Sequence, residues 1–256
     1  MVANENRIGL NNSVFKQRII MKSLSLIVPV FNESTTIPKL VNQLLELRIN
    51  ELHEVIFVDD GSTDNSKFLL ESLLVSTNLP YKILSKKNGG KSSAIKLGSE
   101  ILTSSHVLIV DADLELKIED IPKLWSVVLN NESDFVFGAR VFTAQGSFSW
   151  RYTKANKFLS NLFGLLFDVL VTDIMCGYKL VPVSFLSKLD FKLQGFAIEL
   201  EIPLAMMRQE ESIYEVPVQY WARRRSDGKK IRKRDGLKII LLMFQGRISM
   251  VLRKKH

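Results

Sequence analysis

Hydrophobic residues in the first half of the chain form short, nearly continuous runs that alternate with amphipathic stretches. The continuous runs, which are typical of strands buried on both faces, cover residues 24–30, 54–60, 81–85, 106–113 and 134–140. The amphipathic stretches, which predict helices, cover residues 34–47, 64–77, 91–102 and 118–130. This alternation predicts an α/β fold in which helices cover both faces of a mainly parallel sheet.

Carboxylates stand at the ends of two of these predicted strands. Asp59 and Asp60 close the second run, and Asp111 and Asp113 close the fourth. In parallel α/β sheets, ligands bind beyond the carboxyl ends of the strands, where the loops gather. We therefore expect these four carboxylates to lie along one rim of the sheet, beside a bound ligand.

The second half of the chain contains two apolar stretches of a different kind, at 156–171 and 236–255. The first would extend roughly 24 Å as a helix, which is short of a hydrocarbon core about 30 Å thick. The second contains Lys238 and Arg247 and ends in a basic cluster. Both predict amphipathic helices that lie in a membrane interface. Packing on the domain core or across a dimer would produce the same pattern.

The composition is that of a folded protein with no disulfides. The 256 residues suffice for one large α/β domain or two small ones, and a hydrophobic fraction of 46% argues against general disorder. A single cysteine, Cys176, excludes an internal disulfide and favours a protein that faces the cytosol. Residues 1–22 lack an apolar core of signal-peptide length, and we expect a flexible lead-in there.

The net charge of +8 is concentrated at the C-terminal end. Residues 222–256 contain 13 Lys and Arg against 2 Asp and Glu, so the rest of the chain has 22 basic and 25 acidic residues. Such a segment can attract nucleic acid, anionic lipid headgroups or a phosphorylated substrate, or it can be a solvated charge run.

The stretch HVLIVDADLEL at 106–116 sets three acids at alternate positions. If the strand continues, Asp111, Asp113 and Glu115 share one face and converge. Hard cations such as Mg²⁺ and Mn²⁺ take a few carboxylate ligands, and phosphate oxygens complete the shell. The pattern therefore predicts a metal site for a diphosphate ligand, although acids also commonly end strands and start turns.

Two glycine-containing loops complete the predicted rim. In VDDGSTDNS at 58–66, Gly61 permits a tight turn, and Asp60 can accept hydrogen bonds from a nucleobase or a ribose. Gly89, Gly90 and Lys91 open a predicted helix and suggest a cradle for phosphate. The P-loop template needs glycine where this chain has Ser85, which disfavours a P-loop NTPase.

These motifs together resemble the family 2 glycosyltransferases of the GT-A fold. The resemblance covers about residues 24–140 and rests on PVFNE (29–33), VDDGSTD (58–64), NGGKSSA (88–94) and DAD (111–113). Downstream segments resemble the polyprenyl-phosphate hexosyltransferases, the group that includes the dolichyl-phosphate glucose and mannose synthases. They are GAR (138–140), DIMCGYKL (173–180), EVPVQY (215–220) and RRRSDGKKIRKRDGLK (223–238). DIMCGYKL is closer to the glucosyl-transferring members.

The resemblance implies a Rossmann-like nucleotide-sugar-binding domain and a role for each matching residue. The implied nucleoside contacts are Pro29, Phe31, Glu33 and Asp60, with Lys91 near the ribose or the diphosphate. Asp111 and Asp113 would face the sugar and the metal, and Asp113 and Glu115 would be ligands of Mg²⁺ or Mn²⁺. Arg140 and Arg151 would receive the lipid phosphate, and Arg225 and Lys229 would close over the diphosphate.

Two acidic positions are less settled. Many relatives have an acid directly after the phenylalanine of FAIELEI, where this chain has Ala197, and neither Glu199 nor Glu201 is assigned. Asp173, grouped with the catalytic residues, would be a base in relatives with a hydroxyl acceptor. A phosphate monoester has a second pKa near 6, so it is already ionised and needs charge neutralisation and alignment rather than a base. We therefore expect Asp173 to position the acceptor or sugar, or to hold the loop that carries Cys176 and Gly177.

The predicted organisation is a GT-A catalytic domain at 23–222, followed by a basic acceptor loop and an amphipathic helix at 223–256. The predicted activity is inverting, metal-dependent transfer of glucose from UDP-glucose, or mannose from GDP-mannose, to a polyprenyl phosphate. We expect peripheral attachment to the cytosolic membrane face, directly or through a membrane partner or homo-oligomer. The alternatives are a transferase with a saccharide hydroxyl as acceptor, and a nucleic-acid-binding module built on residues 223–238.

Overall fold

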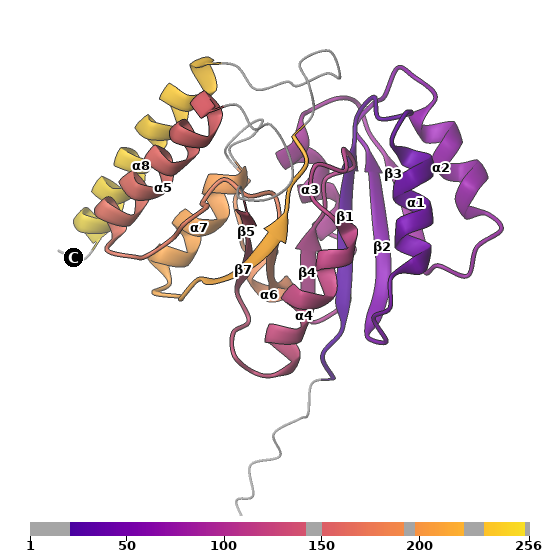
Figure 1. Ribbon diagram of the computed structural model, residues 1–256, viewed down its shortest axis with the longest axis horizontal. Helices are drawn as coiled ribbons and strands as arrows, with labels where there is room; N and C mark the ends of the chain where they lie inside the picture. Colours follow the sequence, from indigo (N-terminus) through magenta and orange to yellow (C-terminus); the bar gives the residue numbers. More distant parts are fainter. Residues whose placement is uncertain (1–20, 142–149, 192–197, 223–232, 254–256) are drawn as a thin grey trace, which may run out of the picture.

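The computed structural model describes residues 21–141, 150–191, 198–222 and 233–253 (Figure 1). Nearly all of the expected lead-in at 1–22 lies outside the described residues, as do Arg225 and Lys229 of the expected acceptor loop.

Within the described residues, seven strands form one sheet in the order β3-β2-β1-β4-β6-β5-β7. The strands are β1 (Leu24–Val30), β2 (Leu52–Asp59), β3 (Tyr81–Ser85), β4 (His106–Ile109), β5 (Val136–Val141), β6 (Lys179–Pro182) and β7 (Tyr214–Gln219). Neighbouring strands are parallel except where β6 pairs antiparallel with β4 and with β5. The predicted α/β class with a mainly parallel sheet is confirmed.

The helices are α1 (Ile37–Glu46), α2 (Ser66–Leu74), α3 (Lys91–Ser99), α4 (Ile121–Leu129), α5 (Trp150–Phe167), α6 (Val183–Leu186), α7 (Ile198–Arg208) and α8 (Lys233–Arg253), with a 3-10 turn at Ile118–Asp120. Figure 1 shows α5 and α8 side by side at the end of the molecule away from β3, and the two helices are in contact.

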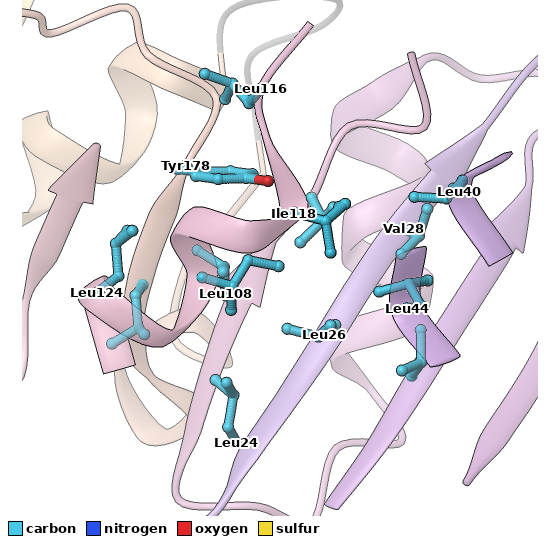
Figure 2. Close-up of a cluster of buried hydrophobic side chains, with 14 of the residues drawn as sticks. Leu24, Leu26, Val28, Leu40, Leu44, Leu108, Leu116, Ile118, Leu124 and Tyr178 are labelled. Atoms are coloured by element: carbon cyan, nitrogen blue, oxygen red, sulfur yellow. The ribbon is translucent and has the colours of Figure 1, made fainter. Parts of the chain in front are cut away.

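The core has two parts because alternate residues of a strand point to opposite faces of the sheet. Leu26 and Val28 of β1 pack on one face with α1, α2 and α4, as Figure 2 shows for Leu40 and Leu44 of α1. Ile27, between them, packs on the other face with residues of α3, α5, α7 and α8. Burying each such aliphatic side chain contributes about 1.5–3 kcal/mol. The sheet is therefore held from both sides, and the loops at its carboxyl edge rest on a fixed base.

One expectation about the strands needs correction. The strand predicted at 106–113 ends at Ile109, and Leu114 has a positive φ of 58°, so the chain turns instead of continuing extended. The acids at 111, 113 and 115 thus do not share one face of a strand. The strand predicted at 134–140 forms as β5, but β6 separates it from β4.

Candidate active site

The loop after β2 is built around the buried carboxylate of Asp60. Its Oδ1 accepts hydrogen bonds from Lys86 Nζ at 2.8 Å and Gly89 N at 2.9 Å, and its Oδ2 accepts one from Gly90 N at 2.7 Å. Gly61 has a φ of 73°, and a Cβ there would lie 2.8 Å from the backbone nitrogen of Asn88. Asp60 therefore fixes the glycine-rich loop, and a glycine is required beside it for the loop to approach.

The loop after β1 is tied to the loop after β2 by side-chain caps. Asn32 Oδ1 accepts from Thr63 N at 2.8 Å, and Ser66 Oγ accepts from Glu33 N at 2.8 Å. Asp64 accepts from Ser34 N and Ser66 N. Burial would raise the pKa of Asp64, but hydrogen bonds from Ser66 and Ser34 outweigh it and lower that pKa to about 2. The two loops therefore form one unit at the rim.

Residues expected to contact a nucleoside lie on this unit. Pro29 and Phe31, at the end of β1, are both partly exposed. Glu33 is buried, and its Oε2 accepts a hydrogen bond from Thr36 Oγ1 at 3.2 Å. The structure thus brings Pro29, Phe31, Glu33 and Asp60 to the same edge of the sheet.

The acids that follow β4 lie on a turn at residues 111–115, which we call the acidic turn. Asp113 Oδ1 accepts a hydrogen bond from Glu115 N at 3.0 Å, and Glu115 Oε2 accepts one from Tyr220 Oη at 2.9 Å. Over the part of the chain that the structure describes, no group of three or more His, Cys, Asp or Glu side chains could hold a metal ion. The three acids therefore do not converge through one strand face, and metal binding by Asp113 and Glu115 stays a prediction. Asp113 and Glu115 remain an all-oxygen pair that fits a hard cation whose other ligands come from a diphosphate.

Asp111 takes part in a different cluster, centred on Lys91. Lys91 Nζ lies 2.5 Å from Asp111 Oδ1 and 2.7 Å from Glu199 Oε1, and all three side chains are mostly buried. Burial would lower the pKa of Lys91, but Asp111 and Glu199 outweigh burial and raise it, so the amine is charged. Among the described residues, Oε2 of Glu199 is buried without a hydrogen-bond partner.

A glycine makes room for this cluster. A Cβ added at Gly177 would overlap Oδ2 of Asp111, so only a residue without a side chain allows Asp111 to occupy its observed position. Gly177 lies in the segment that follows Asp173, far from Asp111 in the sequence. The segment is therefore shaped to fit against the acidic turn.

The third cluster joins Arg140, at the end of β5, to Asp173. Oδ2 of Asp173 accepts from Arg140 Nε at 2.6 Å and Arg140 N at 3.0 Å. Oδ1 accepts from Arg140 Nη2 and Asn156 Nδ2, each at 2.8 Å. Burial would raise the pKa of Asp173, but the bonds from Arg140 outweigh it and lower that pKa, so the carboxylate stays ionised. Asp173 thus holds the guanidinium of Arg140 in one orientation.

Comparison with known proteins assigns the family. Residues 25–190, which carry β1 to β6 and the clusters of Asp60, Asp111 and Asp173, match the family described as Glycosyl transferase family 2. The chain belongs to glycosyl transferase family 2. It is therefore a glycosyltransferase.

Several curated relatives are similar over much of the chain. An uncharacterized protein of Methanocaldococcus jannaschii is 29% identical over 212 residues, which cover 76% of this chain and 87% of the relative. Undecaprenyl-phosphate 4-deoxy-4-formamido-L-arabinose transferase of Proteus mirabilis is 28% identical, covering 88% of this chain and 66% of the relative. Bactoprenol glucosyl transferase of Shigella phage SfX is 35% identical, covering 52% of this chain but only 46% of the relative.

Solved structures confirm the fold. Glucosyl-3-phosphoglycerate synthase from Mycobacterium tuberculosis, in complex with Mn²⁺, UDP and glucosyl-3-phosphoglycerate, superposes with a TM-score of 0.66 at 19% identity. The match covers 90% of this chain and 80% of that one. This glycosyltransferase thus has the GT-A-like fold that its motifs predict.

Within the glycosyltransferase, the segment after Asp173 has a structural centre of its own. The fully buried Lys179 donates to the carbonyl oxygens of Ile174 at 3.1 Å and Cys176 at 2.7 Å. Cys176 is also buried, and burial raises the pKa of its thiol to about 12. A thiol in that state is inert, so Cys176 is a packing residue and not a nucleophile.

Three further predicted site residues are Arg151, Arg225 and Lys229. Arg151 lies exposed in the first turn of α5, while Arg225 and Lys229 fall outside the described residues.

The sequence left Glu199 unassigned and gave Tyr220 no role in the site, yet Glu199 contacts Lys91 and Tyr220 contacts Glu115. The acids in FAIELEI were a signal for Glu199, because they follow the position where relatives have an acid.

None of the helices in the described part of the chain combines the length and hydrophobicity that crossing a bilayer requires.

Proposed function

We propose that this glycosyltransferase moves a hexose from a nucleotide sugar to a polyprenyl phosphate, with inversion, at the cytosolic face of a membrane. UDP-glucose is the preferred donor, ahead of GDP-mannose. Two relatives support a polyprenyl acceptor, because the name of one contains undecaprenyl phosphate and the name of the other contains bactoprenol. The structural neighbour's complex with Mn²⁺ and UDP-glucose supports a nucleotide-sugar donor.

The observation that carries the proposal is the pairing of Asp173 with Arg140. A hydroxyl acceptor needs a base to remove its proton, whereas an ionised phosphate monoester does not. Asp173 is only 1% exposed, and both its oxygens accept hydrogen bonds from Arg140. Glu199, the other acid considered, is ion-paired with Lys91. The engagement of Asp173 with Arg140 therefore supports an acceptor that needs no base.

The proposed reaction is a direct displacement. An oxygen of the acceptor phosphate forms a bond to the anomeric carbon of the hexose from one side, while the bond from that carbon to the diphosphate breaks on the other. The bonding electrons leave with the nucleoside diphosphate, and no proton is transferred. Catalysis then consists of alignment and of stabilising negative charge on both phosphates.

Donor binding is assigned to the rim beside β1 and β2. Pro29, Phe31, Glu33 and Asp60 are the proposed nucleoside contacts, with Asp60 acting in part through the glycine-rich loop that it holds. Lys91, which is charged and paired with Asp111, is proposed to lie beside the ribose or diphosphate. Asp111 is proposed to face the sugar.

Asp113 and Glu115 are proposed to hold Mg²⁺ or Mn²⁺ together with the donor. Their carboxylates lie two residues apart on one turn, and such ions use few protein ligands when a diphosphate supplies the rest. The bound cation would neutralise charge on the leaving diphosphate.

Binding of the acceptor and of the diphosphate is assigned to basic side chains from the second half of the chain. Arg140 and Arg151 are proposed to receive the lipid phosphate, and Arg225 and Lys229, which lie outside the described residues, to close over the diphosphate. Asp173 is the positioning residue for Arg140. A carboxylate that accepts two hydrogen bonds from an arginine fixes the orientation of the guanidinium, and a fixed guanidinium suits recognition of phosphate.

Helices α5 and α8 are proposed to rest on the membrane surface. Exposed apolar side chains recur at helical spacing along α8, at Leu237, Leu241, Phe244, Ile248 and Leu252. Phe158 and Leu165 of the adjacent α5 are also exposed. Exposed cations lie among them, at Lys157, Lys238 and Arg247. Apolar side chains bordered by cations complement a bilayer with anionic headgroups better than they complement a neutral protein surface.

The test of the proposal is transfer of label from radiolabelled UDP-glucose or GDP-mannose into a chloroform-extractable product, with polyprenyl phosphate and Mg²⁺ or Mn²⁺. We expect label from UDP-glucose to enter the lipid phase and Asp113→Ala to abolish the signal. Transfer to a soluble saccharide in preference to the lipid would support the alternative, a family 2 enzyme with a hydroxyl acceptor.

A further inference from the structure

Tyr220 lies between Arg140, the proposed phosphate-binding residue, and Glu115 of the acidic turn. It follows β7 directly, and β7 pairs with β5 so that Val218 lies opposite Arg140. Its ring lies beneath the guanidinium of Arg140, with Cζ of the arginine 5.0 Å from the ring centroid. Its hydroxyl donates to Oε2 of Glu115 at 2.9 Å. One buried side chain thus contacts the proposed phosphate-binding arginine and a proposed metal ligand.

The backbone around Tyr220 reinforces this arrangement. Leu116 and Tyr220 form an isolated antiparallel bridge, and Trp221 N donates to Glu115 O at 2.8 Å. On the preceding residue, Gln219 N donates to Asp120 Oδ2 at 2.6 Å. Hydrogen bonds therefore join the end of β7 to the acidic turn and the residues that follow it.

We propose that Tyr220 is a positioning residue that couples the cation position at Glu115 to the phosphate position at Arg140. The inference rests on the proposed function and deepens it. A hydrogen bond to a metal-ligating carboxylate fixes that ligand and tunes its affinity for the ion. Because the same ring supports Arg140, a cation–diphosphate that holds Glu115 also holds the arginine in place for the acceptor. Binding of one substrate then favours binding of the other.

Two substitutions separate the two contacts. Tyr220→Phe keeps the ring under Arg140 and removes only the hydroxyl that reaches Glu115. Tyr220→Leu removes both. Tyr214→Phe is the matched control, because Tyr214 begins β7, the strand that Tyr220 follows, and its hydroxyl also donates to a glutamate, Glu132 Oε2, at 2.9 Å. Thermal unfolding of each variant checks that it is folded.

The measurement is titration calorimetry on the full chain with Mn²⁺ and UDP, with farnesyl phosphate, and with each in the presence of the other. For the wild type we expect Mn²⁺ with UDP to tighten farnesyl phosphate binding by at least about 5-fold. In Tyr220→Phe we expect Mn²⁺ with UDP to bind about 10-fold more weakly and the coupling factor to fall towards 1. Tyr220→Leu also weakens farnesyl phosphate alone, and Tyr214→Phe matches the wild type.

The outcomes distinguish this inference from the function it rests on. Full coupling in Tyr220→Phe, or no coupling in a wild type that binds both ligands, would overturn the role of Tyr220 and leave the proposed function intact. A wild type that binds neither ligand would overturn the proposed function and the inference with it.

Discussion

Lys91 Nζ lies 2.7 Å from Oε1 of Glu199, although the two residues are 108 positions apart in the sequence. The same ammonium contacts Asp111, so one cation separates the buried carboxylate of Glu199 from the partly exposed carboxylate of Asp111. Removing either carboxylate changes how the lysine is held.

Replacing Glu199 with glutamine is the first test of this cluster. The amide keeps the size of the side chain but removes one of the two negative charges on Lys91. A hydrogen bond to a charged group contributes about 1.5–3 kcal/mol, so we expect kcat/KM to fall at least about 10-fold. Glu71→Gln, which breaks the exposed pair of Glu71 with Lys67 on α2, should leave kcat/KM unchanged. Equal activity of Glu199→Gln and the wild type would remove Glu199 from the site.

Gly177→Ala tests whether the position of Asp111 matters for the reaction. The new methyl would overlap Oδ2 of Asp111, and the carboxylate can swing away because it is the end of a flexible side chain. We expect the free energy of unfolding to change by about 1 kcal/mol or less, while kcat falls by about 10-fold or more through misplacement of Asp111.

The control for that substitution is Gly236→Ala on α8. A Cβ there meets no atom within 4 Å, and alanine within a helix is favoured over glycine by about 0.5–1 kcal/mol. We expect this variant to be as active as the wild type and slightly more stable. Wild-type kcat in Gly177→Ala would mean that the Lys91–Asp111 contact has no part in turnover.

Asp173→Asn tests the pair that holds Arg140. The variant leaves a largely buried guanidinium without its counter-charge, and breaking a buried ion pair in this way costs about 3–5 kcal/mol. Because the pKa of Asp173 is lowered in the folded protein, its contribution is present above its unfolded pKa, near 4, and is lost as the pH falls below that value.

Urea unfolding of the wild type and of Asp173→Asn from pH 7 to pH 3 measures both effects. The difference in unfolding free energy should be constant near neutral pH and should shrink below about pH 4. A difference that stays the same at pH 3, or an asparagine variant as stable as the wild type at pH 7, would show that the carboxylate is not ionised against Arg140.

Leu241→Glu combined with Ile248→Glu tests the proposed membrane face. The two side chains are 55% and 58% exposed on α8, and burying each in a bilayer interface contributes about 1.5–3 kcal/mol. We expect the affinity for anionic phospholipid vesicles, measured by flotation, to fall at least about 10-fold. Phe68→Glu, at a 68% exposed phenylalanine on α2, should bind vesicles like the wild type. If the wild type forms dimers and does not bind vesicles, and the double variant is monomeric, this face binds a second copy of the chain.

The pattern of hydrophobic residues located β1 to β5 because short apolar runs bounded by turn residues favour strands. It placed helix starts early, as at Ser34, which instead donates its backbone N–H to Asp64 in the loop before α1. It missed β6 because that strand has only four residues and begins with Lys179, whose charge is satisfied by backbone carbonyls.

The candidate site was predictable where the motif residues are close in the sequence. Asp111 and Asp113 lie at the sheet rim, as expected from their place after β4. The contacts of Glu199 with Lys91 and of Tyr220 with Glu115 were not predictable, because Glu199 and Tyr220 reach the site only after the chain has added α5, β6 and α7 or β7. Such contacts depend on tertiary packing, which periodicity along the chain does not encode.

The most direct test of the central claim compares two acceptors that differ by one group, polyprenyl phosphate and the corresponding polyprenol. Each is incubated with radiolabelled UDP-glucose and Mn²⁺, and label in the chloroform phase is counted. We predict transfer to the phosphate and none to the alcohol, since Asp173 accepts hydrogen bonds from Arg140, the proposed phosphate-binding residue. Transfer to the alcohol, or to neither lipid while a soluble saccharide is glucosylated, would contradict the account.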